Sequence, residues 1–306
     1  MAGTSTGTPI TPAGISALLR IDFRRVYYEV GEDRAREYPL WCNVDDMEWT
    51  PQTDKQMAGL TSMGEKPVGE RFRVDNPLLG GTKEWVPRPY GKAVELTFEG
   101  WRDENYGIME TLVSEMSKAG YEREEIDAHS AINNAFDTAF PGFTSGEALC
   151  GDHVGQDGVT RRNRPTVDVG FSVTGLQQMI LHYHSLTNER GRRMRMAPQM
   201  CLIHPNNLFT AREILGSGSK PFTTDNEMNS LVAEDLTYMA GHYLTSLTAW
   251  FGLAAKGVHD IQFLWRDMPS FDMFDDPWTR NAIATAYQRH TRGEWAAWRG
   301  TYGSNP

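Results

Sequence analysis

One short stretch of the sequence gathers side chains that could do chemistry. Residues 146–158, GEALCGDHVGQDG, place Cys150, Asp152 and His153 within four positions, framed by glycines. Cys150 and His153 have the Cys-x-x-His spacing that can supply two ligands to a zinc ion. The same pair could act as a nucleophile and its base, provided that a third group orients the histidine. An ordinary glycine-rich turn that holds reactive side chains is the third possibility.

The histidines His182 and His184, in the sequence HYH, are a second candidate for metal binding. Residues 174–188 predict a helix, because Thr174-Gly-Leu-Gln177 fits a capping box and the apolar residues that follow recur with a helical period. Residues two apart on a helix point to roughly opposite sides, so the two histidines should not bind one ion together. We expect His184 to continue the apolar face that begins at Leu176, and His182 to lie off it. We therefore predict no metal ligands.

Familiar catalytic motifs are missing from the sequence. It contains no G-x-S-x-G, no H-E-x-x-H, no G-x-G-x-x-G and no Walker A loop. The paired carboxylates Asp45-Asp46 and Asp275-Asp276 lie in polar surroundings, as solvated turns do. We therefore predict that the protein is not an enzyme and has no catalytic residues and no cofactor. A soluble metal-dependent hydrolase that uses Cys150, His153 and another histidine is the alternative.

Two clusters of basic residues have several explanations. They are Arg161-Arg-Asn-Arg164 and Arg190-Gly-Arg-Arg-Met-Arg195, and the second follows the predicted helix 174–188. Cations at the end of a helix offset its dipole. The same arginines could instead meet a phosphate or an acidic neighbour, and the sequence leaves these readings open.

The composition limits the class of protein. The chain has 306 residues, 40% of them hydrophobic, which is enough for one large domain or two modest ones. A formal net charge of −10 argues against a surface that binds nucleic acid or anionic lipid throughout. Cys42, Cys150 and Cys201 form no C-x-x-C pair, which suits a reducing compartment. We find no signal peptide and no apolar run of about 18 residues, so we expect no membrane span.

The segment 50–98 is rich in proline and glycine and has no helical period. Two alternating stretches, Glu70–Asp75 and Lys92–Phe98, flank the turn-forming Asn76–Thr82, and together they predict a long extended β-hairpin. A hairpin of this length needs another surface to pack on. Residues 1 to about 20 are rich in Gly, Thr, Ser and Pro and predict a loose arm.

The remaining segments predict a mixture of helices and strands. Apolar periodicity predicts a long helix over 104–136, whereas Ile21–Val30 could be a helix or a strand. The other expected elements are a strand at 199–203, a helix at 205–215, and strands at 243–252, 260–266, 281–289 and 294–302. This order indicates an α+β fold.

Several stretches, taken in their order, carry a resemblance to a known family. They are Asn133–Phe136, Gly146–His153 with Arg164-Pro165, Ala197–Pro205, Leu247–Phe251 and Arg292–Ser304. With the arm, the hairpin and the long helix, they resemble the major capsid proteins of tailed bacteriophages that have the Hong Kong 97 fold, and most of all the Mu-like major head subunits. The resemblance covers about residues 50–306, and it rests on the order and spacing of the motifs.

The resemblance implies a structural major capsid protein that self-assembles, as hexamers and pentamers, into an icosahedral head around double-stranded DNA. The DNA would lie on the inner face without sequence-specific contacts. Residues 146–158 would then be a connecting loop in which His153 is structural. An encapsulin-like compartment shell is a further alternative. The implied parts are an N-terminal arm (1–50), an extended hairpin loop (51–98), a peripheral domain with a long spine helix (99–141 and 251–306) and an axial α/β domain (142–250).

The resemblance also implies partners and processing. The chain has no room before the hairpin for the scaffolding segment that some members carry, so we expect a separate scaffold protein, together with a portal and, as a candidate, a decoration protein. The start at Met1 predicts little or no N-terminal cleavage. Some members join subunits through a Lys–Asn bond, but Lys66, Lys83 and Lys92 do not match the lysine of that bond, so we predict no crosslink. We expect assembly in the host bacterial cytoplasm and no membrane partner.

Overall fold

The computed structural model describes residues 12–32, 35–99, 107–144, 146–219 and 228–306. The chain folds into two compact units, each built from three segments. Unit 1 contains the chain up to Arg36, Arg88–Glu124 and Asp267–His290, and unit 2 contains Glu37–Pro87, Glu125–Arg266 and Thr291–Pro306. Among the helices of these described residues, none is both long enough and apolar enough to cross a membrane.

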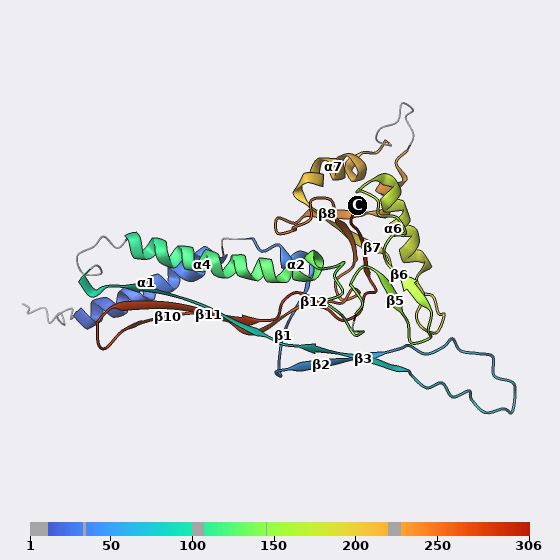
Figure 1. Ribbon diagram of the computed structural model, residues 1–306, viewed down its shortest axis with the longest axis horizontal. Coiled ribbons are helices and arrows are strands. Elements are labelled where there is room, and N and C mark those ends of the chain that lie inside the picture. The colour runs from blue at the N-terminus through green and yellow to red at the C-terminus, as the bar shows by residue number, and fades with distance from the viewer. Residues whose placement is uncertain (1–11, 33–34, 100–106, 145, 220–227) are drawn as a thin grey trace, which may run out of the picture. The chain divides into compact units, whose positions relative to one another are not determined.

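In the described part of unit 1, two long helices lie along a narrow antiparallel sheet (Figure 1). The helices are α1 (Pro12–Glu32) and the larger part of α4 (Gly107–Ala128), and the strands are β4 (Arg88–Leu96), β11 (Ala282–His290) and the second part of β10 (Ile261–Asp275). β4 and β11 are paired along their whole length, from Leu96 opposite Ala282 to Arg88 opposite His290. Buried side chains from both helices and the sheet form the core: Phe23, Tyr27, Met109, Val113, Met116, Phe271 and Ala284.

Unit 2 is centred on a four-stranded sheet with the order β13 (Thr301–Ser304), β9 (Trp250–Ala254), β7 (Pro198–Ile203), β8 (Thr237–Ala240). β7 and β8 are parallel, and the other neighbours are antiparallel. Helix α6 (Val173–Ser185) packs on this sheet, where the Tyr183 hydroxyl donates to the Gly252 carbonyl at 2.9 Å. A Cβ at Gly252 would lie 1.9 Å from the Met179 sulfur, so the helix can approach this closely because the position is glycine.

Shorter elements complete unit 2. Helix α7 (Leu208–Gly216) follows a 3-10 turn, Pro205–Asn207, and a second 3-10 turn covers Ser230–Glu234. The first residues of β10 pair with β1 (Asn43–Asp46) in parallel and with β12 (Glu294–Trp295) in antiparallel fashion. The remaining elements are α2 (Tyr38–Trp41), α5 (Ser130–Asn133) and the small hairpin of β5 (Asp152–Val154) and β6 (Thr160–Arg162).

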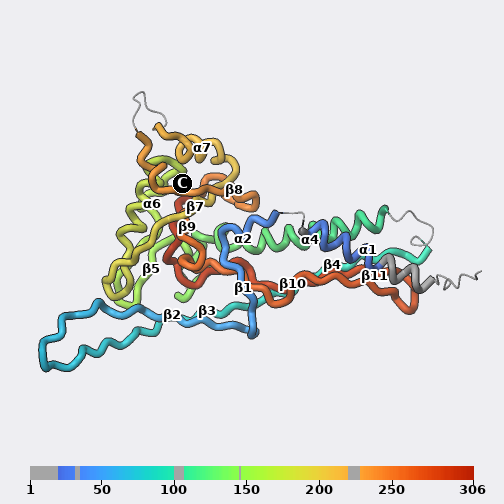
Figure 2. Tube along the Cα trace, turned by 180° about the vertical axis from the view of Figure 1, so that it is seen from behind, coloured from blue at the N-terminus to red at the C-terminus, as the bar shows by residue number. Residues whose placement is uncertain are grey.

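A long hairpin also belongs to unit 2. β2 (Gln52–Met57) and β3 (Leu79–Trp85) are antiparallel, with Gln52 opposite Trp85, and residues 58–78 join them. Figures 1 and 2 both show this joining segment extending away from the rest of unit 2. We call residues 58–78 the hairpin tip.

The structure confirms a hairpin in this region but corrects its strands. Glu70–Asp75 is not a strand, and β4, which contains most of Lys92–Phe98, pairs with β11 instead. The true first strand, Gln52–Met57, consists mainly of polar residues and is exposed on alternate positions. Because neither face of that strand carries an apolar pattern, periodicity could not reveal it.

The long helix predicted over 104–136 is interrupted. α4 ends at Ala128, α5 covers Ser130–Asn133, and positions 104–106 lie outside the described residues. α5 ends before Asn134, whose φ of −105° and ψ of 21° are not helical. The backbone N–H and the side-chain amide of Asn134 both donate to the Ser130 carbonyl, at 3.1 and 2.8 Å.

Part of the segment that was expected to be a loose arm, residues 1 to about 20, is helical, since α1 begins at Pro12. Residues 1–11 lie outside the described part. Proline is favoured in the first turn of a helix because its missing N–H costs no hydrogen bond there. Ile21–Val30, which the sequence left undecided, is helical.

The structure of helix α6 differs from the prediction in its N-cap and in the positions of its two histidines. Its N-cap is Ser172, whose hydroxyl accepts from the Gly175 N–H at 3.3 Å, so Thr174 does not cap the helix. His184 is exposed, whereas His182 is half-buried with its ring 5.3 Å from that of Tyr302. The buried face advances in steps of three and four residues to Tyr183, and it therefore leaves His184 outside.

The strand predictions are confirmed at 199–203, 260–266 and 281–289, although β10 is longer than expected. Residues 243–249 are not a strand, and 294–302 holds two separate strands, β12 and the start of β13. The α+β class predicted from the sequence is confirmed.

Candidate functional site

The glycine-rich stretch 146–158 leads into the small hairpin of β5 and β6. Cys150 is 1% exposed, and its backbone N–H donates to the Ala135 carbonyl at 2.7 Å. Burial raises the pKa of its thiol above the ordinary value, which keeps the side chain uncharged. Cys42 and Cys201 are buried as well, and all three cysteines are free. A buried, protonated thiol is a poor nucleophile and a poor metal ligand.

His153 is held by three neighbours. Its ring stacks on Trp298 with 4.5 Å between centroids and 6° between planes. Nδ1 lies 3.1 Å from a carboxylate oxygen of Glu147, and Nε2 lies 3.2 Å from the amide oxygen of Asn163. Burial lowers the pKa of this histidine, although Glu147 opposes the shift. Both ring nitrogens thus face groups other than Cys150, so the pair is not arranged as nucleophile and base.

Asn163 connects this loop to the closing strand of unit 2. Its side-chain NH2 donates to the carbonyls of Leu149 and Thr301 at 2.8 and 3.0 Å, and its oxygen accepts from the Gly151 N–H at 2.9 Å. Asn163 itself is fully buried. The sequence did not single it out, because one asparagine among polar residues carries no pattern.

The first basic cluster is neutralised within the chain. Arg161 pairs with Asp157 at 2.6 Å, and Arg162 pairs with Asp152 at 2.6 Å. Arg164 pairs with Asp168. The Arg161 guanidinium lowers the pKa of Asp157 to about 2. These contacts account for the three arginines as parts of the fold.

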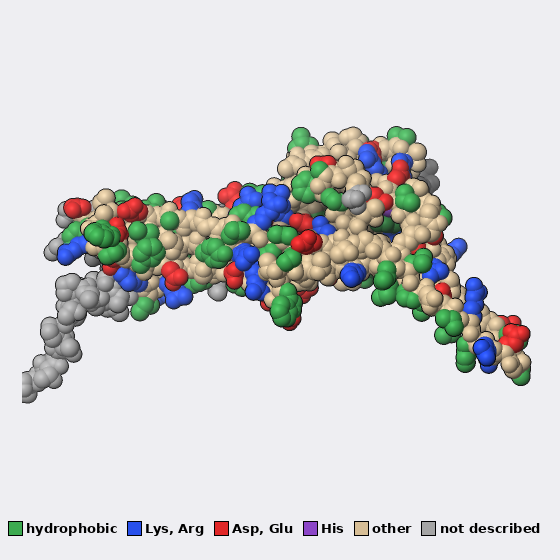
Figure 3. Space-filling model, turned by 60° about the horizontal axis from the view of Figure 1, so that its bottom comes forward, with side chains coloured by type: hydrophobic (Ala, Val, Ile, Leu, Met, Phe, Trp, Pro, Cys, Tyr) green, Lys and Arg blue, Asp and Glu red, His purple; other side chains and the backbone are tan. Residues whose placement is uncertain are grey.

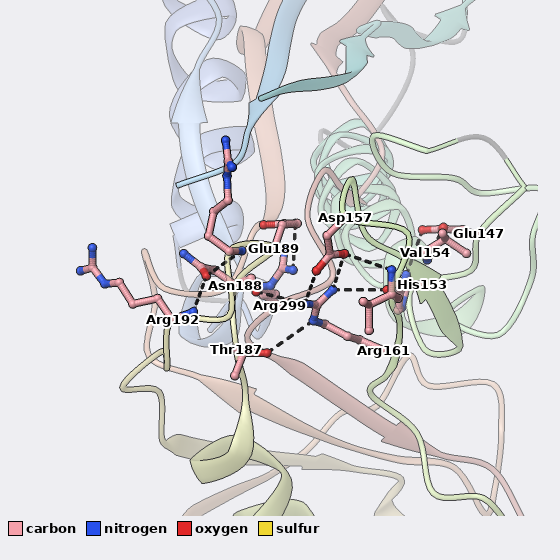
Figure 4. Close-up of polar contacts among 12 residues, drawn as sticks. Glu147, His153, Val154, Asp157, Arg161, Thr187, Asn188, Glu189, Arg192 and Arg299 are labelled. Carbon is pink, nitrogen blue, oxygen red and sulfur yellow. Dashed lines mark hydrogen bonds and ion pairs between the residues drawn. The ribbon is translucent and has the colours of Figure 1, made fainter. Parts of the chain in front are cut away.

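The second basic cluster surrounds a turn next to the hairpin. Figure 4 shows polar contacts around Asn188, whose side-chain oxygen accepts from the Arg190 and Arg192 N–H groups at 3.0 and 2.8 Å. The Arg190 guanidinium reaches the hairpin and donates to the Asn76 carbonyl at 2.6 Å. A pocket of about 700 Å³ opens beside this turn, lined by Met57, Gly59, Asn188, Glu189, Arg192, Arg193, Met194, Arg195, Met196, Val258 and Arg299.

The base of the long hairpin is anchored in its own subunit. Trp85 at the end of β3 is fully buried among Met47, Leu264 and Ala296, and its indole N–H donates to Asp54 at 2.7 Å. Lys83 forms an ion pair with Glu294 at 2.6 Å. These contacts hold the start of β2 and the end of β3 in place.

The hairpin tip, in contrast, exposes its large apolar side chains. Met63, Val68, Phe72 and Val74 are between 81% and 104% exposed. Figure 3 shows hydrophobic and charged side chains together along the narrow end of the molecule at the lower right. A bond from the Thr61 N–H to Asp75 at 2.6 Å ties the two sides of the tip together. Apolar groups that their own chain leaves uncovered are typical of a surface that packs on a partner.

A possible metal site lies where the sequence did not indicate one. Among the described residues, the group of three side chains with metal-ligand atoms close together is Glu37, Glu125 and His129. The spacing of Glu125 and His129, four apart within the helix predicted over 104–136, was the available signal. Glu37 is distant in sequence, so only the fold brings it to the other two.

A family model identifies the family of the chain, and solved structures share its fold. A family model described as phage capsid protein matches residues 82–302. No curated protein matches the chain. Solved structures with a similar fold include the capsid of cyanophage P-SCSP1u, with a TM-score of 0.57, 9% identity and coverage of 89% of each chain. The procapsid of bacteriophage JBD30 has a TM-score of 0.50 and 15% identity over 97% of this chain and 76% of that one. A virus-like particle from Pyrococcus furiosus has a TM-score of 0.51 and 5% identity over 93% of this chain and 98% of that one.

Proposed function

Because this chain belongs to the phage capsid protein family and is a structural capsid protein of the Hong Kong 97 type, we propose that its hairpin tip joins neighbouring subunits of the head. The protein is not an enzyme, so the alternative of a hydrolase that uses Cys150 and His153 is wrong. The family match also favours a phage head over a compartment shell. We infer that the subunits assemble as hexamers and pentamers into an icosahedral head that encloses double-stranded DNA.

The contrast between the two ends of the hairpin carries this proposal. The base is fixed by the buried Trp85 and by the Lys83–Glu294 ion pair, whereas Met63, Val68 and Phe72 in the tip are almost fully exposed. Complete burial of a large apolar side chain contributes about 1.5–3 kcal/mol. Several such side chains, buried on the next subunit, would stabilise a lattice contact by several kcal/mol. Exposed apolar groups would otherwise favour nonspecific aggregation.

Replacement of the tip tests the proposal. In the variant, a short Gly-Ser linker replaces residues 60–74, so β2, β3 and their buried anchor stay intact. We expect a folded subunit whose circular dichroism and thermal unfolding match those of the wild type, but which no longer forms shells or rings. A variant that assembles normally would refute the role of the tip.

We propose functional domains as the resemblance implies. They are an arm in residues 1–50, the hairpin loop in 51–98, a peripheral domain in 99–141 and 251–306, and an axial domain in 142–250. These domains are defined by their place in a shell, so they need not coincide with the two compact units. Cryo-electron microscopy of an assembled head would test each range directly.

The proposed partners beyond the subunit itself are a separate scaffold protein, the portal and a decoration protein, with DNA on the inner face. We propose that assembly takes place in the host bacterial cytoplasm before the protein becomes part of the virion. The net charge of −10 supports weak, nonspecific DNA contact, since anionic surfaces repel phosphate. Co-expression with neighbouring genes should raise the yield of uniform shells if one of them encodes the scaffold.

We predict that no covalent bond joins the subunits. Of the hairpin lysines, Lys83 is engaged with Glu294, and Lys66 lies over the Phe72 ring, 4.8 Å from its centroid. Denaturing gels of assembled particles should show one band of monomer size. A ladder of covalent multimers would contradict this.

A further inference from the structure

Three side chains from separate parts of the sequence meet inside unit 2. Glu125 and His129 lie four residues apart at the end of α4, and Glu37 directly precedes α2. One ligand atom from each lies within 4.8 Å of the other two. A carboxylate, a second carboxylate and an imidazole at this spacing can surround one cation.

One nitrogen of the His129 imidazole, Nε2, has no hydrogen-bond partner among the described residues, whereas Nδ1 lies 3.6 Å from a Glu125 carboxylate oxygen. Nδ1 lies 2.8 Å from the Glu125 carbonyl oxygen, and because a carbonyl only accepts, Nδ1 carries the hydrogen. Nε2 therefore carries the lone pair. His129 is fully buried, and its Nε2 has no hydrogen-bond partner. Buried polar atoms are nearly always satisfied, so an unpartnered lone pair needs an explanation.

Nε2 also lies close to a turn that contacts Glu37. A Cβ at Gly241 would lie 3.4 Å from His129 Nε2, which places this nitrogen against the backbone beside His242. His242 donates its N–H to the Glu37 carboxylate at 3.0 Å, and its ring Nδ1 contacts the same carboxylate. The free nitrogen and the Glu37 carboxylate thus lie beside the same turn.

Hydrogen bonds from the backbone orient both carboxylates. Glu125 accepts the backbone N–H of Glu37 at 2.6 Å and that of Tyr38 at 3.3 Å. A carboxylate oxygen has two lone-pair sites and can accept a hydrogen bond and bind a cation at the same time. A histidine whose other nitrogen bonds a backbone carbonyl, and carboxylates held by hydrogen bonds, are the usual supports of metal ligands.

We propose that Glu37, Glu125 and His129 bind one divalent transition-metal ion, and that His242 is a positioning residue that orients Glu37. One imidazole with two carboxylates suits Zn²⁺ and disfavours Ca²⁺ and Mg²⁺, which take oxygen ligands almost exclusively. Water completes the coordination. The ion would connect the start of α2 to the end of α4, two segments that are 88 residues apart in sequence.

Zn²⁺ titration of the untagged, full-length chain after chelator treatment tests the proposal. Calorimetry and metal analysis should find one Zn²⁺ per chain. Glu37→Gln and His129→Gln should each weaken binding at least about tenfold, because even loss of a group that supports a ligand costs that much. His184→Gln is the matched control, since His184 is exposed on α6 and should leave binding unchanged.

Two results would overturn the site. One is the absence of stoichiometric Zn²⁺ binding by the wild type, as expected if a water molecule satisfies His129. The other is Glu37→Gln and His129→Gln chains that bind as tightly as the wild type. If His129→Gln fails to fold, the visible spectrum of the Co²⁺-loaded wild type decides. Ligand-field bands without a thiolate charge-transfer band are expected, whereas a thiolate band would assign the ion to cysteine.

Discussion

Replacement of Phe72 by serine is the sharpest test of how the hairpin tip works. The Phe72 side chain is 81% exposed, so nearly its whole surface is available for burial on another subunit. Full burial of a phenylalanine contributes about 1.5–3 kcal/mol, and scaling by this exposure leaves about 2 kcal/mol per contact. Since 1.4 kcal/mol corresponds to a factor of ten, each contact should weaken by about 30-fold.

The same substitution should have little effect on the stability of the isolated subunit. Lys66 lies 4.8 Å from the Phe72 ring centroid, and an exposed contact of this kind contributes about 0.5–1 kcal/mol. The free energy of unfolding should therefore fall by less than about 1 kcal/mol. Phe72→Tyr is the matched control, because it keeps the apolar ring and should assemble like the wild type.

Light scattering over a concentration series, with electron microscopy of the products, measures the effect. The concentration needed for assembly should rise by at least about 30-fold for Phe72→Ser and stay within about threefold for Phe72→Tyr. An unchanged threshold for Phe72→Ser would refute the burial of this ring between subunits. A large loss of subunit stability would show instead that the ring packs within its own chain.

Three further predictions concern the subunit itself. Trp85→Ala should lower the free energy of unfolding by about 3–5 kcal/mol, because Trp85 is fully buried. Trp49→Ala is the control, since Trp49 is 75% exposed and its loss should change the free energy of unfolding by less than about 0.5 kcal/mol. Equal effects of the two substitutions in denaturant titrations would contradict the role of Trp85 as an anchor. Asn163→Leu should cost about 3 kcal/mol or more, since it leaves two carbonyls and one N–H without their buried partner, and a neutral result in the same titrations would disprove the role of Asn163. Burial lowers the pKa of His182 from 6.5 to about 4, so this residue contributes stability above pH 6.5 that is lost as the pH falls toward 4, at about 1.4 kcal/mol per pH unit. His182→Phe should flatten the loss of stability between pH 6.5 and 4, and an unchanged slope would show that His182 is not buried in the neutral form.

The sequence predicted elements where burial imposes a pattern. Residues 199–203 form a predominantly apolar run, and they are the central strand β7. The helical period after residue 173 likewise predicted α6, although Ser172 rather than Thr174 caps it. Residues 146–158 were a candidate site because they combine glycines with a cysteine and a histidine. Their contacts, however, depend on Asn163 and Trp298, which only the tertiary fold brings to them.

Other features left no local signal. The half-buried positions of β2, Gln52, Asp54 and Gln56, are all polar, so its pairing with β3 cannot be read from hydrophobic alternation. Glu37 approaches His129 only because the chain folds back on the end of α4. The break between α4 and α5 falls at His129, and the helical periodicity of the sequence does not register it.

The most direct test of the capsid assignment is the size of the particles that the chain forms. The untagged protein would be studied by sedimentation velocity over a range of concentrations, alone and co-expressed with its neighbouring genes, with electron microscopy of the fast-sedimenting material. The phage capsid assignment predicts shells, tubes or rings of hexamer size. A 34.5 kDa monomer at every concentration and with every co-expressed partner would contradict it.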